Sequence, residues 1–296
     1  MVQYTDLFFD SHDGLKLYAR DYPASTSAAT PASASVTTII CLPGLTRNCA
    51  DFEELCSSLA ENYRLLAVDF RGRGRSDYDA NPHNYHPGIY AQDITSLMQA
   101  EAIDGAIFIG TSLGGLVAMT LAATTPSAVL GIVLNDVGPE VDPVGLARIR
   151  SYVSNDREAV NWHVAVSNTR AINEEALPGL SDVQWRKFTR RLYRDDDSGR
   201  AALNFDQAIS VLFEEQDPND PPIDLWPLFY MLRDVPLLVL RGAHSDILSA
   251  QVVAKMATVH PLMQSLEVKG RGHAPLLDEP GVVNVIKQFL LGILAD

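Results

Sequence analysis

Short apolar runs alternate with stretches of helical periodicity along the first part of the chain. The runs, several of them rich in β-branched residues, lie at residues 36–42, 63–70, 106–110 and 130–135. Continuous apolar runs are typical of strands that are buried on both faces. The segments between them predict helices over residues 50–61, 88–103 and 113–124. Strands separated by helices indicate right-handed crossovers and a parallel sheet.

Four further strands complete the predicted sheet. Two of them are joined by Asp13-Gly14, a dipeptide typical of hairpin turns, and lie at residues 5–11 and 15–22. Near the end of the chain the alternation resumes, with strands at 236–241 and 264–268 and helices at about 249–259 and 280–294. We therefore expect an α/β fold with a mostly parallel, eight-stranded sheet and helices on both faces.

A helical, polar and aromatic segment interrupts this pattern from about Asp142 to Arg233. Because it lies within the sheet pattern and not after it, an inserted cap is favoured over an independent domain. The expected organisation is a core of residues 1–137 and 234–296 with a helical cap over 138–233. The aromatic residues of the cap are expected to form either the wall of an apolar pocket or the cap's own core.

The charge of the chain restricts its partners. Of the 296 residues, 47% are hydrophobic, which is enough for a large core, and 37 acidic against 23 basic side chains give a formal net charge of −14. An acidic surface repels nucleic acid and anionic membranes. We expect a small-molecule substrate, with no nucleic-acid or membrane partner, and the oligomeric state stays open.

Cysteine usage and the N-terminal residues favour the cytoplasm. The three cysteines, Cys41, Cys49 and Cys56, form no disulfide framework and lack metal-ligand spacing, so no metal site is expected. The N-terminal residues lack the basic start and apolar stretch of a secretory signal. A run of about 18 apolar residues, as a membrane span needs, is also missing.

The central chemical signal is Gly110-Thr111-Ser112-Leu113-Gly114, which matches G-x-S-x-G. It follows an apolar strand and opens a predicted helix, the setting that a nucleophile elbow requires. Flanking glycines relieve the crowding of such a sharp turn, and the helix N-terminus favours developing negative charge. The alternative is that Ser112 merely caps the helix.

Five motifs in the expected order make the chain similar to the α/β-hydrolase superfamily over nearly its whole length. Each follows a predicted strand, and they read Pro43-Gly44-Leu45, DFRGRGRSD (Asp69 to Asp77), GTSLGG (Gly110 to Gly115), RGAHSD (Arg241 to Asp246) and GRGHAP (Gly270 to Pro275). The resemblance implies a chain order of serine, acid and histidine for the catalytic triad.

The resemblance places the base at His273 and the acid at Asp246. A serine hydroxyl needs a general base within hydrogen-bond reach, and that base needs an orienting partner. His273 occupies the family position among the seven histidines of the chain. Asp246 follows a strand by a short loop, the usual family site, while Asp136 after the sixth strand is the rival because some family members place the acid there.

Two backbone N–H groups are expected to form an oxyanion hole. One is the N–H of Leu113, directly after the nucleophile. The resemblance puts the other at Leu45, in the loop after the third strand. Many family members have His-Gly where this chain has Pro43-Gly44, a change that removes an imidazole and leaves the backbone donor in place.

The expected activity is that of a serine hydrolase, a carboxylesterase-like enzyme that cleaves an ester of a small, mainly apolar substrate through an acyl-enzyme, with no cofactor. Lactone hydrolysis, thioester hydrolysis and carbon–carbon bond cleavage are alternatives on the same triad. A ligand-sensing binding protein that keeps the fold is a further alternative, because fold alone does not determine function.

Overall fold

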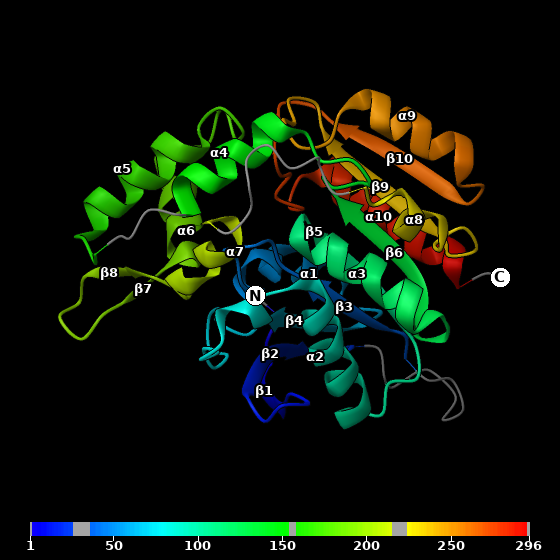
Figure 1. The fold of residues 1–296 in the computed structure, drawn as a ribbon, viewed down its shortest axis with the longest axis horizontal. Coiled ribbons are helices and arrows are strands. Elements are labelled where there is room, and N and C mark those ends of the chain that lie inside the picture. The colour runs from blue at the N-terminus through cyan, green and yellow to red at the C-terminus, as the bar shows by residue number, and fades with distance from the viewer. Residues whose placement is uncertain (1, 26–35, 154–157, 215–223, 295–296) are drawn as a thin grey trace.

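The computed structural model describes residues 2–25, 36–153, 158–214 and 224–294. Its main feature is an eight-stranded sheet with the order β1-β2-β4-β3-β5-β6-β9-β10 (Figure 1). Only the two pairs that involve β2 are antiparallel. The strands span Thr5–Asp10 (β1), Lys16–Tyr22 (β2), Thr38–Leu42 (β3), Arg64–Asp69 (β4), Ala106–Thr111 (β5), Val129–Asn135 (β6), Leu237–Gly242 (β9) and Met263–Val268 (β10). The predicted mostly parallel sheet of eight strands is confirmed.

Alternate residues of the central strands enter two separate cores, one on each face of the sheet. Ile40 and Phe108 belong to the first core, while Ile39 and Ile107 belong to the second. The first face is covered by α2 (Pro87–Ala100), α3 (Leu113–Thr124), α8 (Trp226–Tyr230) and α9 (Ala250–Val259). The second is covered by α1 (Glu53–Leu59) and α10 (Pro280–Ile293). Both faces are buried, which explains why the strands are continuously apolar.

The chain between β6 and β9 is mainly helical, as the loss of strand pattern predicted. It contains α4 (Pro143–Val153), α5 (Trp162–Asn173), α6 (Asp182–Leu192), α7 (Val211–Glu214) and α8, with a small hairpin of β7 (Tyr193–Asp195) and β8 (Ala201–Leu203). Figure 1 shows α4 to α7 and the hairpin gathered at one side of the molecule. Trp226 and Phe229 of α8 instead belong to the core that also contains α3 residues.

No helix within the described residues is long and apolar enough to cross a bilayer.

Candidate active site

Ser112 occupies a tight turn between β5 and α3. Its backbone has φ 50° and ψ −115°, in the left-handed half of conformational space that residues other than glycine rarely adopt. The turn is possible because glycines surround it: a Cβ added to Gly110 would lie 2.4 Å from the carbonyl carbon of Gly114. The strand–turn–helix arrangement predicted for this segment is therefore present.

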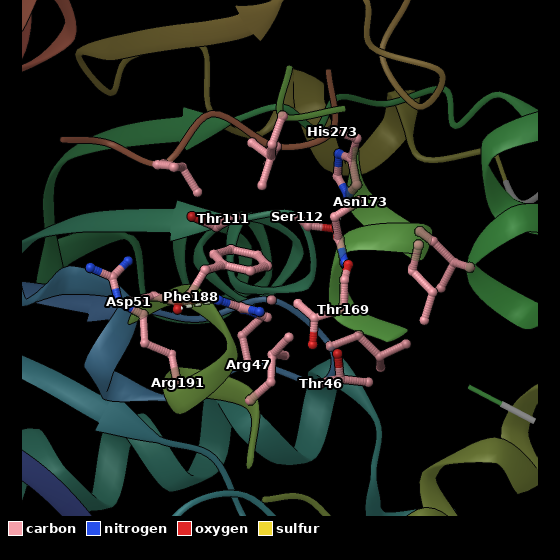
Figure 2. Close-up of a pocket in the computed structure, with 18 of the residues that line it drawn as sticks. Thr46, Arg47, Asp51, Thr111, Ser112, Thr169, Asn173, Phe188, Arg191 and His273 are labelled. Carbon is pink, nitrogen blue, oxygen red and sulfur yellow. Dashed lines mark hydrogen bonds and ion pairs between the residues drawn. The ribbon is translucent and has the colours of Figure 1, made fainter. Parts of the chain in front are cut away.

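His273 lies after β10 and reaches the Ser112 hydroxyl. Its Nε2 is 3.0 Å from Ser112 Oγ, and the two residues come from segments 161 positions apart. The imidazole is almost completely buried, with 8% of its side chain exposed. Figure 2 shows the two side chains facing each other above the pocket. The structure therefore brings together the predicted nucleophile and the predicted base.

The carboxylate beside His273 belongs to Asp136, so the expectation of Asp246 at this position is wrong. Asp136 Oδ2 lies 2.8 Å from His273 Nδ1. The same carboxylate accepts hydrogen bonds from the Gly242 N–H at 2.7 Å and the Ser245 hydroxyl at 2.6 Å. Its side chain is fully buried, so these bonds hold it in one orientation.

Asp246 instead forms an ion pair with Arg148 of α4. The two distances are 2.5 Å from Nε to Oδ2 and 2.9 Å from Nη2 to Oδ1, and each side chain is 30% exposed. Burial opposes ionisation here, but the hydrogen bond from Arg148 prevails and lowers the pKa of Asp246. Asp246 therefore links α4 to the loop after β9, and Ser245 beside it supports Asp136 in its place.

The backbone donors expected for an oxyanion hole are free. Leu113 begins α3, and its N–H makes no hydrogen bond within the described part of the chain; the same holds for the N–H of Leu45. Leu45 lines the same pocket as Gly44 and Ser112, and Leu113 directly follows Ser112 in the chain. Backbone N–H groups that lie beside a nucleophile and have no other partner can donate hydrogen bonds to the negative charge that develops on the substrate oxygen.

Two buried charged side chains support the loop that carries Leu45. Arg73 donates from Nε to the Leu45 carbonyl oxygen at 2.9 Å, and its Nη1 is 2.7 Å from the Tyr90 hydroxyl. Asp69, at the end of β4, accepts from the N–H groups of Cys49 and Arg75 at 2.7 and 2.9 Å. Burial raises the pKa of Asp69. Two residues of the DFRGRGRSD motif, Asp69 and Arg73, therefore have a structural role.

A cavity of about 140 Å³ opens beside Ser112 (Figure 2). Loops at the carboxyl ends of β3 and β5 form one wall, and the helical segment between β6 and β9 forms the other. The helical wall includes apolar Phe188 but also polar Thr169, Asn173 and Arg191. The expectation of an apolar wall is thus met only in part. The sequence of this helical segment has no periodicity that would have indicated which polar residues line the pocket.

The one grouping of potential metal ligands within the described residues is His12, Asp13 and Asp93, and it lies outside the pocket. Arg71 occupies it: its guanidinium donates to both carboxylates at distances of 2.5 to 3.0 Å. This guanidinium already binds the carboxylate oxygens and would repel a cation placed beside it. This cluster is therefore an ion-pair network around the buried guanidinium of Arg71.

Comparisons with known proteins agree with this architecture. Residues 37–280 match a sequence model of the alpha/beta hydrolase fold. The crystal structure of an alpha/beta hydrolase from Novosphingobium aromaticivorans is 43% identical with a TM-score of 0.89, over 98% of this chain and 99% of that chain.

Two relatives that are named as hydrolases are similar to this chain at the sequence level. A 3-hydroxybutyrate-oligomer hydrolase of Cupriavidus necator is 30% identical over 86% of this chain and 88% of its own length. A 2-(acetamidomethylene)succinate hydrolase of Mesorhizobium japonicum is also 30% identical, over 78% and 79% of the two chains. The family model matches most of the chain, and the eight-stranded sheet and the turn that carries Ser112 between a strand and a helix agree with it. The chain therefore belongs to the α/β-hydrolase fold family.

Proposed function

We propose that the protein is a serine hydrolase that cleaves a carboxylic ester of a small substrate through an acyl-enzyme. The observation that carries this proposal is the hydrogen-bonded series Ser112, His273 and Asp136, with successive distances of 3.0 and 2.8 Å. This is the arrangement in which a base activates a serine hydroxyl and an acid orients the base. The size of the cavity and the names of the two relatives support a small substrate.

In the proposed reaction, Ser112 Oγ attacks the ester carbonyl while His273 Nε2 takes the hydroxyl proton. Asp136 accepts the Nδ1–H hydrogen bond and stabilises the imidazolium that forms. His273 then returns the proton to the leaving alcohol as the carbon–oxygen bond breaks. Water, deprotonated by the same imidazole, attacks the carbonyl carbon of the acyl-enzyme. The bond from that carbon to Ser112 Oγ then breaks, His273 returns the proton to Oγ, and the acid is released. The N–H groups of Leu45 and Leu113 hold the oxyanion in both steps.

Covalent labelling tests the nucleophile. A fluorophosphonate probe should attach to the wild-type protein, with the adduct located at Ser112 by peptide mass spectrometry. Ser112→Ala should abolish the adduct, while Ser96→Ala on helix α2, which does not line the pocket, should leave it unchanged. Failure of the folded wild type to react would contradict the proposed function. A panel of short nitrophenyl esters, thioesters, lactones and a ring-fission diketone then separates ester cleavage from the other reactions of the same triad.

We expect Arg73 to act as a positioning residue for the Leu45 donor. Arg73→Gln removes the hydrogen bond to the Leu45 carbonyl oxygen, so kcat should fall about tenfold or more, with a smaller change in KM, because the donor acts on the transition state. Steady-state kinetics on 4-nitrophenyl butyrate measures kcat and KM separately and so tests this prediction.

Two further variants control for that substitution. Tyr90→Phe removes the hydroxyl that accepts one hydrogen bond from the Arg73 guanidinium. It should therefore lower kcat by less than Arg73→Gln does, again with a smaller change in KM. Arg75→Gln, whose side chain is 52% exposed, should change neither constant. An unaltered kcat in a folded Arg73→Gln protein would show that the loop keeps its position without Arg73.

A further inference from the structure

Arg191 is a buried cation without an anionic partner among the described residues. It lies in the last turn of α6 and is 7% exposed. Its side chain takes part in none of the ion pairs of the described chain, and its Nε is buried with no hydrogen-bond partner. Only its backbone is engaged, because the Arg191 carbonyl oxygen accepts from Asn48 Nδ2 at 2.6 Å.

The other deeply buried arginines are neutralised or hydrogen-bonded. Arg71 is paired with Asp13, Asp79 and Asp93. Arg73 donates to two carbonyl oxygens and a hydroxyl. Burying a charge is costly unless a partner or hydrogen bonds compensate for it. Arg191 lacks such compensation, which indicates that its partner is not part of the described chain.

Arg191 lines the same pocket as Ser112 and His273, and Figure 2 shows it on the side of the pocket away from these two residues. The second arginine of this pocket, Arg47, is already occupied. Its guanidinium makes two hydrogen bonds to Asp51, at 2.6 and 2.5 Å, and lies 4.2 Å from the ring centre of Phe188. The pocket therefore contains one neutralised arginine and one that is available.

Two carboxylates, Glu54 and Asp278, lie near enough to Arg191 for its charge to affect their pKa values. For Glu54, a hydrogen bond from Lys187 is the main cause of a lowered pKa, and Arg191 adds a smaller effect through space. For Asp278, burial raises the pKa and Arg191 only opposes this. Neither forms an ion pair with Arg191 in the structure.

We propose that Arg191 binds a carboxylate of the substrate, and hence that the natural substrate is an ester that also carries a free carboxylate. The planar fork of a guanidinium matches the two oxygens of a carboxylate, and a ligand that brings this charge into the pocket compensates the buried cation. The net charge of −14 strengthens the argument, because such a protein attracts anions only where a local cation is placed for them. The inference rests on the proposed ester hydrolysis and narrows its substrate class.

The first test uses the wild-type protein and paired substrates. The ester 3-butanoyloxybutanoate is compared with its carboxamide, which has the same shape and a single ester but no charge. Butyl succinate is compared with butyl succinamate, so that the carboxylate lies on the acyl side instead. We expect kcat/KM to favour the anion in at least one pair by about 10- to 100-fold, the range for a hydrogen bond to a charged group.

The second test is Arg191→Gln, with Arg186→Gln as the matched control. Arg186 lies on the same helix and carries the same charge, but it is exposed and does not line the pocket. In Arg191→Gln the ratio of kcat/KM for the anionic ester to kcat/KM for its carboxamide should fall to about one, mainly because KM for the anion rises. For the carboxamides, kcat/KM should stay within a few-fold of the wild-type value. Arg186→Gln should keep the full preference.

The outcomes separate this inference from the proposed function. Wild-type protein that cleaves both members of each pair equally well overturns the carboxylate proposal and leaves ester hydrolysis intact, even if Arg191→Gln fails to fold. A preference that survives in folded Arg191→Gln likewise overturns the role of Arg191. Wild-type protein that cleaves none of the four esters and does not react with the fluorophosphonate contradicts the proposed function itself.

Discussion

Asp136→Asn should lower kcat by about 10⁴-fold, the loss known for a triad aspartate that orients a histidine. The carboxamide keeps the size of the carboxylate, so the packing around it should change little. However, its NH₂ cannot accept the Nδ1–H of His273, and facing the imidazole it favours the tautomer in which Nε2 carries the proton. In that tautomer His273 cannot take the proton of Ser112. The effect should appear in kcat on 4-nitrophenyl butyrate.

Asp246→Asn is the matched control for this substitution. Both aspartates follow neighbouring strands of the sheet, and both replacements remove one negative charge. Asp246 is partly exposed and paired with Arg148, and such pairs contribute at most about 1 kcal/mol. Its replacement should leave kcat within a few-fold of the wild-type value. A greater loss in Asp246→Asn than in Asp136→Asn would mean that Asp246 is the triad acid.

Gly114→Ala should reduce kcat by about 10²-fold or more and lower stability by roughly 1–3 kcal/mol. An added Cβ would lie 2.1 Å from the Leu42 carbonyl oxygen and 2.8 Å from that of Pro43. These two residues end β3 and lead into the loop that carries Leu45. Relief of the clash must therefore move either that loop or the start of α3, and either movement separates the two oxyanion donors.

Gly292→Ala on α10 controls for the loss of a glycine in a helix. Its added Cβ would meet nothing within 4 Å, so its stability should stay equal or rise by up to about 1 kcal/mol, with unchanged kcat. Thermal unfolding and steady-state kinetics give both quantities for the two variants. Wild-type activity in Gly114→Ala would show that the contact between α3 and β3 tolerates a methyl group without moving the donors.

The choice of the acid shows why the sequence was insufficient at one position of the site. Asp136 and Asp246 both fit the order of serine, acid and histidine, and β6 and β9 are adjacent in the sheet. Asp136 turns toward His273 because its backbone adopts φ 60° directly after β6. Asp246 turns toward Arg148, which is nearly a hundred residues away in the chain. Neither feature has a local sequence signal.

The sequence was also insufficient to predict which side chains of the helical segment between β6 and β9 line the pocket. This segment's lack of strand pattern predicted helices, and helices are present. Which of its side chains would reach the pocket depended on the packing of α5 and α6 against the core. Trp185 and Phe188 belong to one apolar cluster, but of the two only Phe188 also lines the pocket and lies against the guanidinium of Arg47. Periodicity places both residues on the buried face without distinguishing the two roles.

The sequence by itself determined the features that depend on neighbouring residues: the buried parallel strands, the glycine-flanked turn that presents Ser112, and the position of His273 in a loop after the last strand. Only the tertiary structure decided which aspartate is hydrogen-bonded to His273 and which arginine of the pocket has no anionic partner among the described residues. The physical reason is that strands and turns are set by local sterics and hydrophobic periodicity. Hydrogen bonds and ion pairs between distant segments instead depend on how the packed elements meet.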